Sequence, residues 1–434
     1  MRNFGAVGLI VFLLITPIAF FDSGEMACAS GEYENSLLQL PPGPSYQFDP
    51  DIIFQRGVTF NAFSNITRCD PGTGDFEIGY LNQDSLRDLA VISNETDYVT
   101  IFNGTADGGF SSTGWRIQSS AMRDLRNLAV GDLDGDGLHD IVVSHLSATY
   151  TPQITILYQS NNFDPSPTKS TTTDLYGSDP RELVIGDFGG TPHNDVAVAC
   201  SGATLSSDDR VTVWRYPFGG LDDSTNIFVS GVTNGRLLAK GDVDGDGKLD
   251  LIVGDKGGPS VVVMPYPFSS SLPITIAGHV ISDIATADIA GNGRVDLAIA
   301  VSSQSRVYVF HNTGSGLPPT ADEWIDTHSG LSTITLGDLN GDSVTDLVTL
   351  SSTGNNASVF LQALSHEWYP EPNQTFPINA GAVKAMISNF TSMLSLFVLA
   401  NGGGDVPATL EEFYSSSGKV GNADFNLIVP FVEP

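Results

Sequence analysis

The stretch GDLDGDGLHDIVV, residues 131–143, places four aspartates within nine positions and then becomes apolar. The aspartates stand at positions 1, 3, 5 and 9 of a loop that is counted from Asp132. Oxygen-bearing side chains at every second residue of a tight turn can converge on one point, and Gly137 allows the sharp bend. The DIVV run that follows favours a strand. The stretch therefore predicts a turn that binds a cation between two strands.

The ligands of this loop are all hard oxygens. Carboxylates at positions 1, 3, 5 and 9 and the backbone carbonyl of Leu138 at position 7 supply them, with no histidine or cysteine. Such a set selects Ca²⁺ over zinc, and its flexible, higher coordination number favours Ca²⁺ over Mg²⁺. An EF-hand needs a ligand at position 12 and flanking helices, whereas position 12 here is Val143. The alternative is that the aspartates only form the turn, but four unpaired carboxylates would repel one another.

The acidic loop is repeated along the chain, and successive copies are 46 to 55 residues apart. The other copies begin at Gly79 (GYLNQDSLRDLAVI), Gly186 (GDFGGTPHNDVAVA), Gly241 (GDVDGDGKLDLIV), Ala287 (ADIAGNGRVDLAIA), Gly337 (GDLNGDSVTDLVTL) and, in a worn form, Ser388 (SNFTSMLSLFVLA). Such a period is typical of repeat architectures.

A second landmark has the same period. Alternating segments follow several loops, namely YVTIFN (98–103), ITILYQ (154–159), VTVWRYPF (211–218), VVVMPYPF (261–268) and RVYVFHN (306–312). Each repeat then reads as four short strands, and no window keeps apolar residues at helical spacing. We predict an all-β fold, a seven-bladed β-propeller of four-stranded blades with calcium-binding loops.

The loop copies differ in their ligands. We predict three complete Ca²⁺ sites, one weaker site, and three loops that have lost the metal. The complete sites consist of Asp132, Asp134, Asp136, Leu138 and Asp140; of Asp242, Asp244, Asp246, Lys248 and Asp250; and of Asp338, Asn340, Asp342, Val344 and Asp346. The weaker site consists of Asp288, Asn292, Arg294 and Asp296. Leu138, Lys248, Val344 and Arg294 contribute only a backbone carbonyl.

The net charge of −31 argues against nucleic acid or an anionic membrane as a partner. Residues 4–21 carry no charge and precede a small-residue cleavage pattern at Ala27–Ala29, which predicts a secretory signal peptide over 1–29. An uncleaved membrane anchor is the alternative. Six glycosylation sequons agree with export, at Asn65, Asn94, Asn103, Asn356, Asn373 and Asn389. We therefore expect a secreted glycoprotein, with no membrane insertion once the signal is removed.

Three parts of the chain are expected. They are the signal peptide (1–29), an N-terminal segment and linker (30–72), and the propeller (73–434). The flanking segments 46–67 and 423–434 are candidates for a strand that closes the ring. Cys69 and Cys200 would remain after cleavage and are able to pair as a disulfide.

The repeats resemble the FG-GAP/VCBS family, whose D-x-[DN]-x-D-G-x-x-D loops occur in the integrin α propeller. The resemblance spans about Thr73 to the C-terminus. It implies structural calcium in the turn between a blade's first two strands, on the face opposite the ligand surface. It also implies that loops between strands two and three form that surface, here 93–97, 144–153, 201–210 and 352–356. The FG and GAP halves are absent, so the likeness is to the general repeat.

No catalytic motif is present, so we do not expect an enzyme. The favoured function is an extracellular adhesion or interaction module that binds a protein. The alternative partner is a cell-surface glycan, because some propellers of this type resemble fungal lectins, and an extracellular lyase or oxidoreductase is less favoured. Trp115, Trp214, Trp324 and Trp368 can stack on sugars, although aromatic residues in repeated strands more often belong to the core.

Overall fold

The computed structural model describes residues 54–60 and 74–415. Short ranges within these are excluded, namely 94–96, 107–109, 112–113, 119–121, 160–169, 176–178, 191–192, 202–209, 217–223, 233–234, 370, 381, 391–392 and 401–408. The predicted signal peptide, Cys69 and the segment 423–434 lie outside the described residues. Cys200 is fully buried in the described part.

The described residues form seven antiparallel sheets of four strands each, and they contain no helix. Sheets 1 to 4 consist of β2 (Gly74–Gly79), β3 (Asp88–Ser93), β4 (Tyr98–Phe102) and β5 (Trp115–Gln118); β6 (Arg123–Gly131), β7 (Asp140–Leu146), β8 (Pro152–Leu157) and β9 (Ser170–Asp174); β10 (Asp179–Gly186), β11 (Asp195–Ser201), β12 (Arg210–Trp214) and β13 (Ser224–Phe228); and β14 (Gly235–Gly241), β15 (Asp250–Asp255), β16 (Ser260–Met264) and β17 (Leu272–Thr275).

Sheets 5 and 6 consist of β18 (Ile281–Ala287), β19 (Asp296–Val301), β20 (Arg306–Phe310) and β21 (Glu323–Asp326); and β22 (Leu331–Gly337), β23 (Asp346–Ser351), β24 (Asn356–Phe360) and β25 (Gln374–Pro377). In sheet 7, β26 (Ala382–Phe390), β27 (Met393–Ala400) and β28 (Thr409–Ser415) are joined by β1 (Phe54–Phe60). The all-β fold of four-stranded blades that the sequence predicts is confirmed.

The strands of each sheet differ in burial according to their place in the blade. Second strands such as β15 and β19 are buried along their whole length, because both of their faces pack against neighbouring sheets. Their sequences are accordingly continuous apolar runs after the first aspartate. Fourth strands such as β5 and β17 bury only one of their four side chains. The first strand of each sheet is therefore the inner strand of a blade and the fourth is the outer strand.

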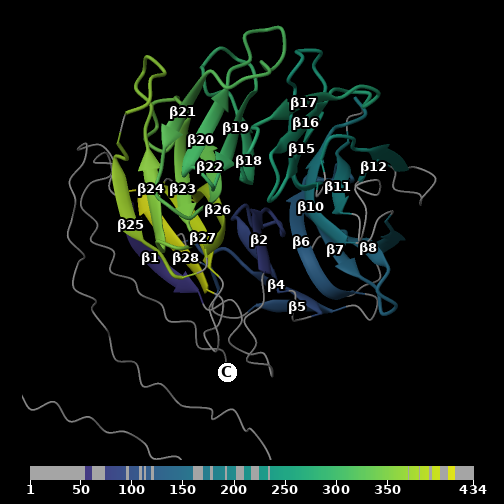
Figure 1. The fold of residues 1–434 in the computed structure, drawn as a ribbon. Helices are drawn as coiled ribbons and strands as arrows, with labels where there is room; N and C mark the ends of the chain where they lie inside the picture. Colours follow the sequence, from purple (N-terminus) through teal and green to yellow (C-terminus); the bar gives the residue numbers. More distant parts are fainter. Residues whose placement is uncertain are drawn as a thin grey trace, which may run out of the picture. The chain divides into compact units, whose positions relative to one another are not determined.

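The sheets follow one another around a common centre (Figure 1). The inner strands β2, β6, β10, β14, β18, β22 and β26 contact each other in that order, and β2 also contacts β27 of the last sheet. The strand β1, from the segment 46–67, pairs with β28 and forms the outer strand of sheet 7. The strand β1 thus completes the last blade and covers the edge that β28 would otherwise expose.

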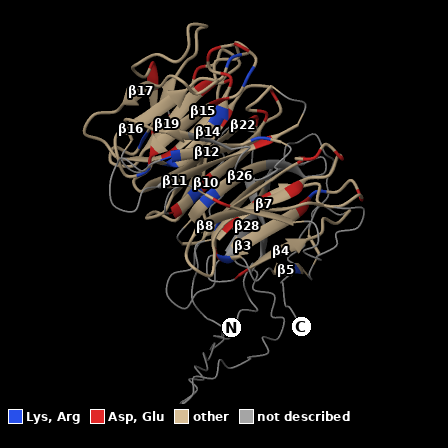
Figure 2. Ribbon diagram, turned by 90° about the vertical axis from the view of Figure 1, so that its right-hand side faces the viewer, with Lys and Arg blue, Asp and Glu red and all other residues tan. Residues whose placement is uncertain are grey.

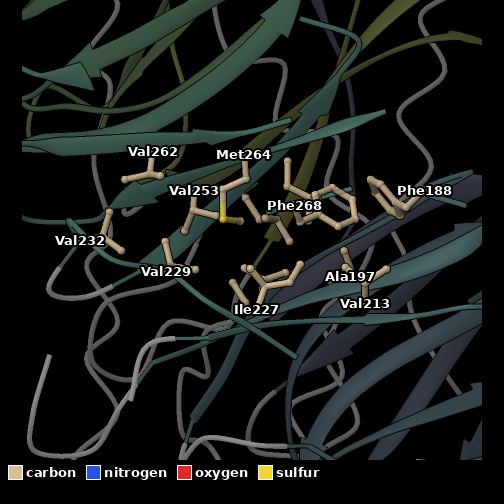
Figure 3. Packing of buried hydrophobic residues seen from close by; sticks show 14 residues of the cluster. Phe188, Ala197, Val213, Ile227, Val229, Val232, Val253, Val262, Met264 and Phe268 are labelled. Carbon is tan, nitrogen blue, oxygen red and sulfur yellow. The ribbon is translucent and has the colours of Figure 1, made fainter. Parts of the chain in front are cut away.

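Hydrophobic cores fill the spaces between adjacent sheets. Between sheets 3 and 4, Phe188 and Phe268 lie in edge-on contact, with ring centroids 6.4 Å apart. Val213 and Val253 from the two sheets belong to the same cluster (Figure 3). Burying one such side chain contributes about 1.5–3 kcal/mol. The fold is held mainly by these apolar layers between the blades.

A polar residue four positions before the loop glycine ties most inner strands together. Asp75 accepts the backbone N–H of Leu128 in the next sheet at 2.9 Å. Three further residues accept a hydrogen bond from a backbone N–H group of the following sheet at 2.9–3.0 Å. They are Asn127, Glu182 and Asp283, and their donors are Leu183, Leu238 and Ile334, respectively. Side-chain oxygens thereby satisfy backbone donors that the sheets leave unpaired.

The interface between the last and the first sheet is closed by an ion pair. Lys384, at the same repeat position in β26, places its Nζ 2.6 Å from Asp75 Oδ1 and 2.8 Å from Glu77 Oε1. Burial lowers the pKa of the Lys384 ammonium, but the two carboxylates outweigh it, so that the net pKa is raised. Burial also raises the pKa of Glu77. The long lysine side chain closes the ring where four of the other interfaces use a hydrogen bond to the backbone.

Candidate metal-binding loops

The acidic loops connect the first and second strands of their sheets, as predicted. Asp132 at position 1 accepts the backbone N–H groups of Gly135 at 2.7 Å and of Gly137 at 3.0 Å. Both glycines have positive φ angles, +80° and +88°, which side-chain-bearing residues rarely adopt. The turn therefore requires the aspartate and the glycines together, and Asx hydrogen bonds hold its backbone in place.

Carboxylates converge in two of the loops. One oxygen from each of Asp132, Asp134 and Asp136 lies within 4.8 Å of the others. In the loop after β14, Asp242, Asp244 and Asp250 meet the same condition. Three like charges at this separation repel one another unless a cation lies among them, and hard oxygens are the ligands that Ca²⁺ prefers. The donor set of both loops fits calcium.

The other two predicted sites contain asparagines with engaged amides. Asn340 Nδ2 donates to Asp342 Oδ2 at 2.9 Å. Asn292 Nδ2 donates to the Asn312 carbonyl at 3.0 Å, and its Oδ1 accepts the Arg294 N–H at 2.9 Å. These loops keep the fold of the first two but contain fewer carboxylates. The loop from Asp338 remains a predicted calcium site, and the loop from Asp288 a weaker one.

The residue at position 7 is held in the same way in all four loops. The backbone N–H groups of Leu138, Lys248 and Val344 donate to the position 5 carboxylate at 2.8 Å. Arg294 N–H makes the equivalent bond to Asn292. The backbone that would present the predicted carbonyl ligand is thus fixed by the loop itself.

The aspartate at position 9 has a structural role that sequence reasoning missed. Asp140 is fully buried, and its oxygens accept the N–H groups of Leu133 at 3.0 Å and Gln159 at 2.9 Å. The corresponding pair of bonds, at 2.6–3.0 Å, recurs at Asp88, Asp195, Asp250, Asp296 and Asp346. The carboxylate therefore joins the acidic loop to the end of the third strand. Its retention in the loops starting at Gly79 and Gly186, where metal ligands are missing, was the signal available in the sequence.

Burial dominates the electrostatics of these position 9 aspartates. It raises the pKa of Asp140 to about 7, that of Asp250 to about 6 and that of Asp346 to about 7, although hydrogen bonds from backbone N–H groups lower each of them. A divalent cation nearby would favour the ionised form. The ionised aspartates are thus costly to bury, and calcium would reduce that cost.

Adjacent loops are hydrogen-bonded to each other around the rim. The residue at position 8 bonds to the backbone carbonyl at position 1 of the preceding loop in three cases. His139 donates its backbone N–H to Tyr80 at 2.9 Å, Asn194 its side-chain Nδ2 to Asp132 at 2.8 Å, and Thr345 its hydroxyl to Asp288 at 2.7 Å. A change in the backbone of one loop can therefore alter a hydrogen bond of the loop in the next sheet.

Two of the three loops predicted to lack metal are described in part. In the first, the Arg87 guanidinium carbon lies 5.6 Å from the ring centre of Tyr80 at position 1. Asp84 still accepts the N–H of Leu86 at 2.8 Å, as position 5 does elsewhere. In the loop from Gly186, residue 191 lies outside the described residues. In the last copy, the side chains of residues 388–395 are likewise not described.

The opposite end of the sheets carries the loops between strands two and three. Of the four predicted ligand loops, only 144–153 and 352–356 are described completely. In the first, the Ser147 hydroxyl accepts the N–H groups of Thr149 and Thr151, and Tyr150 is 78% exposed with φ of 61°. A bulky residue with positive φ is strained, and such strain often marks a functional site.

The four tryptophans divide between core and surface. Trp214 is buried, and Trp368 is half-buried and donates its Nε1–H to Glu323 at 3.1 Å. Trp115 and Trp324 are 51% and 55% exposed on outer strands. Of the four, these last two are the most accessible to a ligand.

No helix among the described residues is long and apolar enough to cross a membrane. A model of the FG-GAP-like repeat matches residues 81–143 and 268–349. No curated protein matches the chain. Among solved structures, two crystal structures of BBS1N in complex with ARL6DN, one soaked with lead and one with mercury, are similar at 11% identity and a TM-score of 0.56. The aligned regions cover 83% and 84% of this chain and 96% and 97% of the BBS1N chains. Two segments of the chain thus match the FG-GAP-like repeat, and its sheets are the four-stranded blades of a β-propeller.

Proposed function

We propose that this protein is an extracellular, calcium-stabilised propeller that binds a partner protein through the face opposite its acidic loops. The convergence of Asp132, Asp134 and Asp136 is the observation that carries the calcium part. The exposed, strained Tyr150 supports a binding role for the opposite face. The fold neighbour BBS1N was crystallised in complex with ARL6DN, which supports a protein as the partner.

In this proposal calcium is structural. It neutralises the carboxylates of each loop and fixes the turn between a blade's first two strands, while the position 8 contacts extend this rigidity from loop to loop. Extracellular modules bind Ca²⁺ with Kd values of about 10⁻⁴–10⁻³ M. Secretion through the predicted signal peptide would expose the loops to such concentrations, and an uncleaved N-terminal anchor would do the same at the cell surface.

A melting experiment with two matched variants tests the calcium part. Asp136 and Asp84 both stand at position 5, both are exposed, and both accept the N–H of the position 7 residue at 2.8 Å. Only the loop that contains Asp136 keeps carboxylates at positions 1 and 3. We expect Ca²⁺ to raise Tm relative to EGTA, Asp136→Asn to reduce that rise, and Asp84→Asn to leave it unchanged. A Tm that does not respond to Ca²⁺ in the unmodified protein would refute the proposal.

The partner part is tested by capture from cell surfaces with purified protein and with Tyr150→Ala. The expected result is a defined protein that the wild type retains and the variant loses, while the Ca²⁺ response of Tm stays the same. If both proteins capture the same partner equally, Tyr150 is not part of the interface. Capture of nothing but glycans would refute protein binding.

Glycan binding is a second candidate because of one surface on sheet 5. There Trp324 and Tyr308 lie with ring centroids 6.4 Å apart, and the Arg306 guanidinium carbon is 5.3 Å from the Trp324 ring centre. Arg306 Nε also donates to Asp326 at 2.6 Å. An aromatic platform bordered by planar polar groups can stack on a sugar ring and bond its hydroxyls. A glycan array would show a defined sugar bound by the wild type and lost in Trp324→Ala.

A further inference from the structure

The residue that follows the third strand differs between sheets with and without a full set of predicted calcium ligands. In sheets 2, 4 and 6, which have the full set, this residue is uncharged, namely Tyr158, Pro265 and Leu361. In sheets 3 and 5, which lack a ligand at loop position 3, it is Arg215 and His311. Basic residues are few in this chain, with 19 Lys and Arg against 50 Asp and Glu, and Figure 2 shows both kinds along the ribbon. A basic residue at this position therefore accompanies the loss of the position 3 ligand.

This position faces the acidic loop of its own sheet. In sheet 2, burial raises the pKa of Tyr158 to about 12, and the carboxylates of Asp140 and Asp134 contribute to the rise. In sheet 5, Nδ1 of His311 lies 3.6 Å from Oδ2 of Asp296, the aspartate at loop position 9. The side chain that follows the third strand is thus close to the carboxylates among which a calcium ion would bind.

In sheet 3, Arg215 lies against the loop at position 3. This position is Gly189, and a Cβ atom there would lie 3.6 Å from Cδ and 3.7 Å from Nε of Arg215. The same Cβ atom would lie 3.3 Å from Oδ2 of Asp195, the carboxylate at position 9. Arg215 and Asp195 therefore lie beside the point from which the Asp134 side chain projects in the loop of sheet 2.

The charges around the position 9 aspartate differ accordingly. Burial raises the pKa of Asp195, two backbone N–H groups lower it, Asp187 raises it and Arg215 lowers it. In sheets 2, 4 and 6, the main charges that act on the equivalent aspartate are those of other aspartates in the loop, which raise its pKa. Arg215 thus gives the loop of sheet 3 a positive charge from the chain itself.

The loop of sheet 3 does not fit a calcium ion. Position 3 is Gly189 and position 5 is Thr191, so two of the four carboxylates are missing. Ca²⁺ takes about six to eight oxygen ligands, and a loop with two carboxylates supplies too few of them. The remaining carboxylates, Asp187 and Asp195, still repel each other, and a nearby guanidinium group reduces that repulsion without any ligand set.

We propose that Arg215 takes the place of calcium in sheet 3, so that a side chain rather than a metal ion neutralises the acidic loop. The inference rests on the proposed calcium sites of sheets 2, 4 and 6. His311 has the equivalent place in sheet 5, where position 3 is Ala290. Sheet 3 would then keep its loop in place at any Ca²⁺ concentration, whereas its two neighbours would need the metal.

The main test transfers this arginine into sheet 2. In Tyr158→Arg, a guanidinium group is introduced near Asp140 and Asp134 and should displace the metal. The whole protein carrying this substitution should bind one Ca²⁺ fewer than the wild type in equilibrium dialysis. Tyr158→Gln is the matched control, because it introduces a polar side chain without a charge, and it should bind as many Ca²⁺ ions as the wild type.

A second pair of variants examines sheet 3 itself and covers the case in which Tyr158→Arg fails to fold. Arg215→Gln should lower Tm by the same amount in Ca²⁺ and in EGTA, because the loop beside it holds no metal. Arg215→Lys keeps the positive charge and should lose less Tm than Arg215→Gln in both solutions.

Three outcomes would overturn the inference. They are undiminished Ca²⁺ binding in Tyr158→Arg, loss of one Ca²⁺ in Tyr158→Gln as well, and an equal fall in Tm in Arg215→Gln and Arg215→Lys. If the wild type binds Ca²⁺ and Tyr158→Arg binds just as many ions, this inference alone fails. A wild type that binds no Ca²⁺ would instead refute the proposed calcium sites, and this inference with them.

Discussion

Replacing Lys384 with methionine should weaken the closure of the ring. Methionine keeps much of the apolar stem of lysine but removes the ammonium group that lies 2.6 Å from Asp75 and 2.8 Å from Glu77. Asp75 is only 3% exposed. Its Oδ1 keeps one hydrogen bond, from the N–H of Phe76. The variant therefore leaves two carboxylates near each other without their cation.

The expected loss of stability is large for one substitution. Removing one member of a buried ion pair typically costs about 3–5 kcal/mol, and the 28% exposure of the Lys384 side chain places this loss at the lower end of the range. At about 2.1 cal/mol/K of unfolding entropy per residue, the loss corresponds to a fall in Tm of roughly 4 °C in a protein of this size. Arg306→Met is the matched control. It removes an ion pair with Asp326, whose side chain is 69% exposed, and such surface pairs contribute about 0–1 kcal/mol.

The assay is thermal unfolding at constant calcium, with the two variants and a rescue variant. Lys384→Met combined with Glu77→Gln removes one of the stranded charges and should recover part of the lost Tm. Burial raises the pKa of Glu77, and Lys384 lowers it. Without Lys384, Glu77 is protonated at higher pH, so the destabilisation should be smaller at pH 5 than at pH 8. A Lys384→Met variant that loses no more Tm than Arg306→Met would refute the closure by this ion pair.

Three further predictions concern the loops and the inner strands. Ser343 has φ of 67° where the other predicted calcium loops carry glycine, so Ser343→Gly should raise stability by about 1 kcal/mol in a melting scan. A fall in Tm would show that the Ser343 side chain matters more than the backbone strain. Asp88→Asn should lower Tm equally with and without Ca²⁺, because the Asp88 oxygens hold the N–H groups of Leu81 and Gly104 in a loop without a full ligand set. Asp132→Asn should instead lower Tm mainly when Ca²⁺ is present. Burial raises the pKa of Glu182 to about 7, above its ordinary 4.5. The contribution of this group to stability should therefore grow as pH falls from about 7 towards 4.5. Glu182→Gln should remove this component, and a variant whose Tm has the same pH profile as that of the wild type would count against the prediction.

The repeat itself could be predicted from the sequence because its features are local. A period of 46 to 55 residues, a glycine-containing loop and a continuous apolar run define the first two strands of six of the seven sheets. The glycines at 135 and 137 do adopt positive φ, and the turn follows from residues that are adjacent in the chain. Local chemistry also predicts a ligand set at Asp132, Asp134 and Asp136, and the oxygens of these three residues converge.

The contacts between the blades could not be predicted in the same way, since they depend on how one sheet is placed against the next. Asp75, Asn127, Glu182 and Asp283 read as ordinary polar residues of an inner strand. Their common spacing, four residues before the loop glycine or its equivalent, becomes meaningful only when the N–H groups that they satisfy are known to lie in the next sheet. The same holds for Asp140, whose partner Gln159 lies across the blade.

The polar residues of one repeat are arranged along the inner strand, so the two faces of the propeller can change independently. In sheet 3, Arg181 lies near the start of the strand, Glu182 ties it to the next sheet, and Gly186 opens a loop that is predicted to have lost its metal. In sheet 2, Arg126 has the same place, and the loop keeps its carboxylates. The arginine at this position thus occurs with and without a full set of predicted calcium ligands at the other end of its strand. Calcium should therefore affect the acidic-loop end of the blades much more than the ion pairs that Arg126 and Arg181 make near the opposite end.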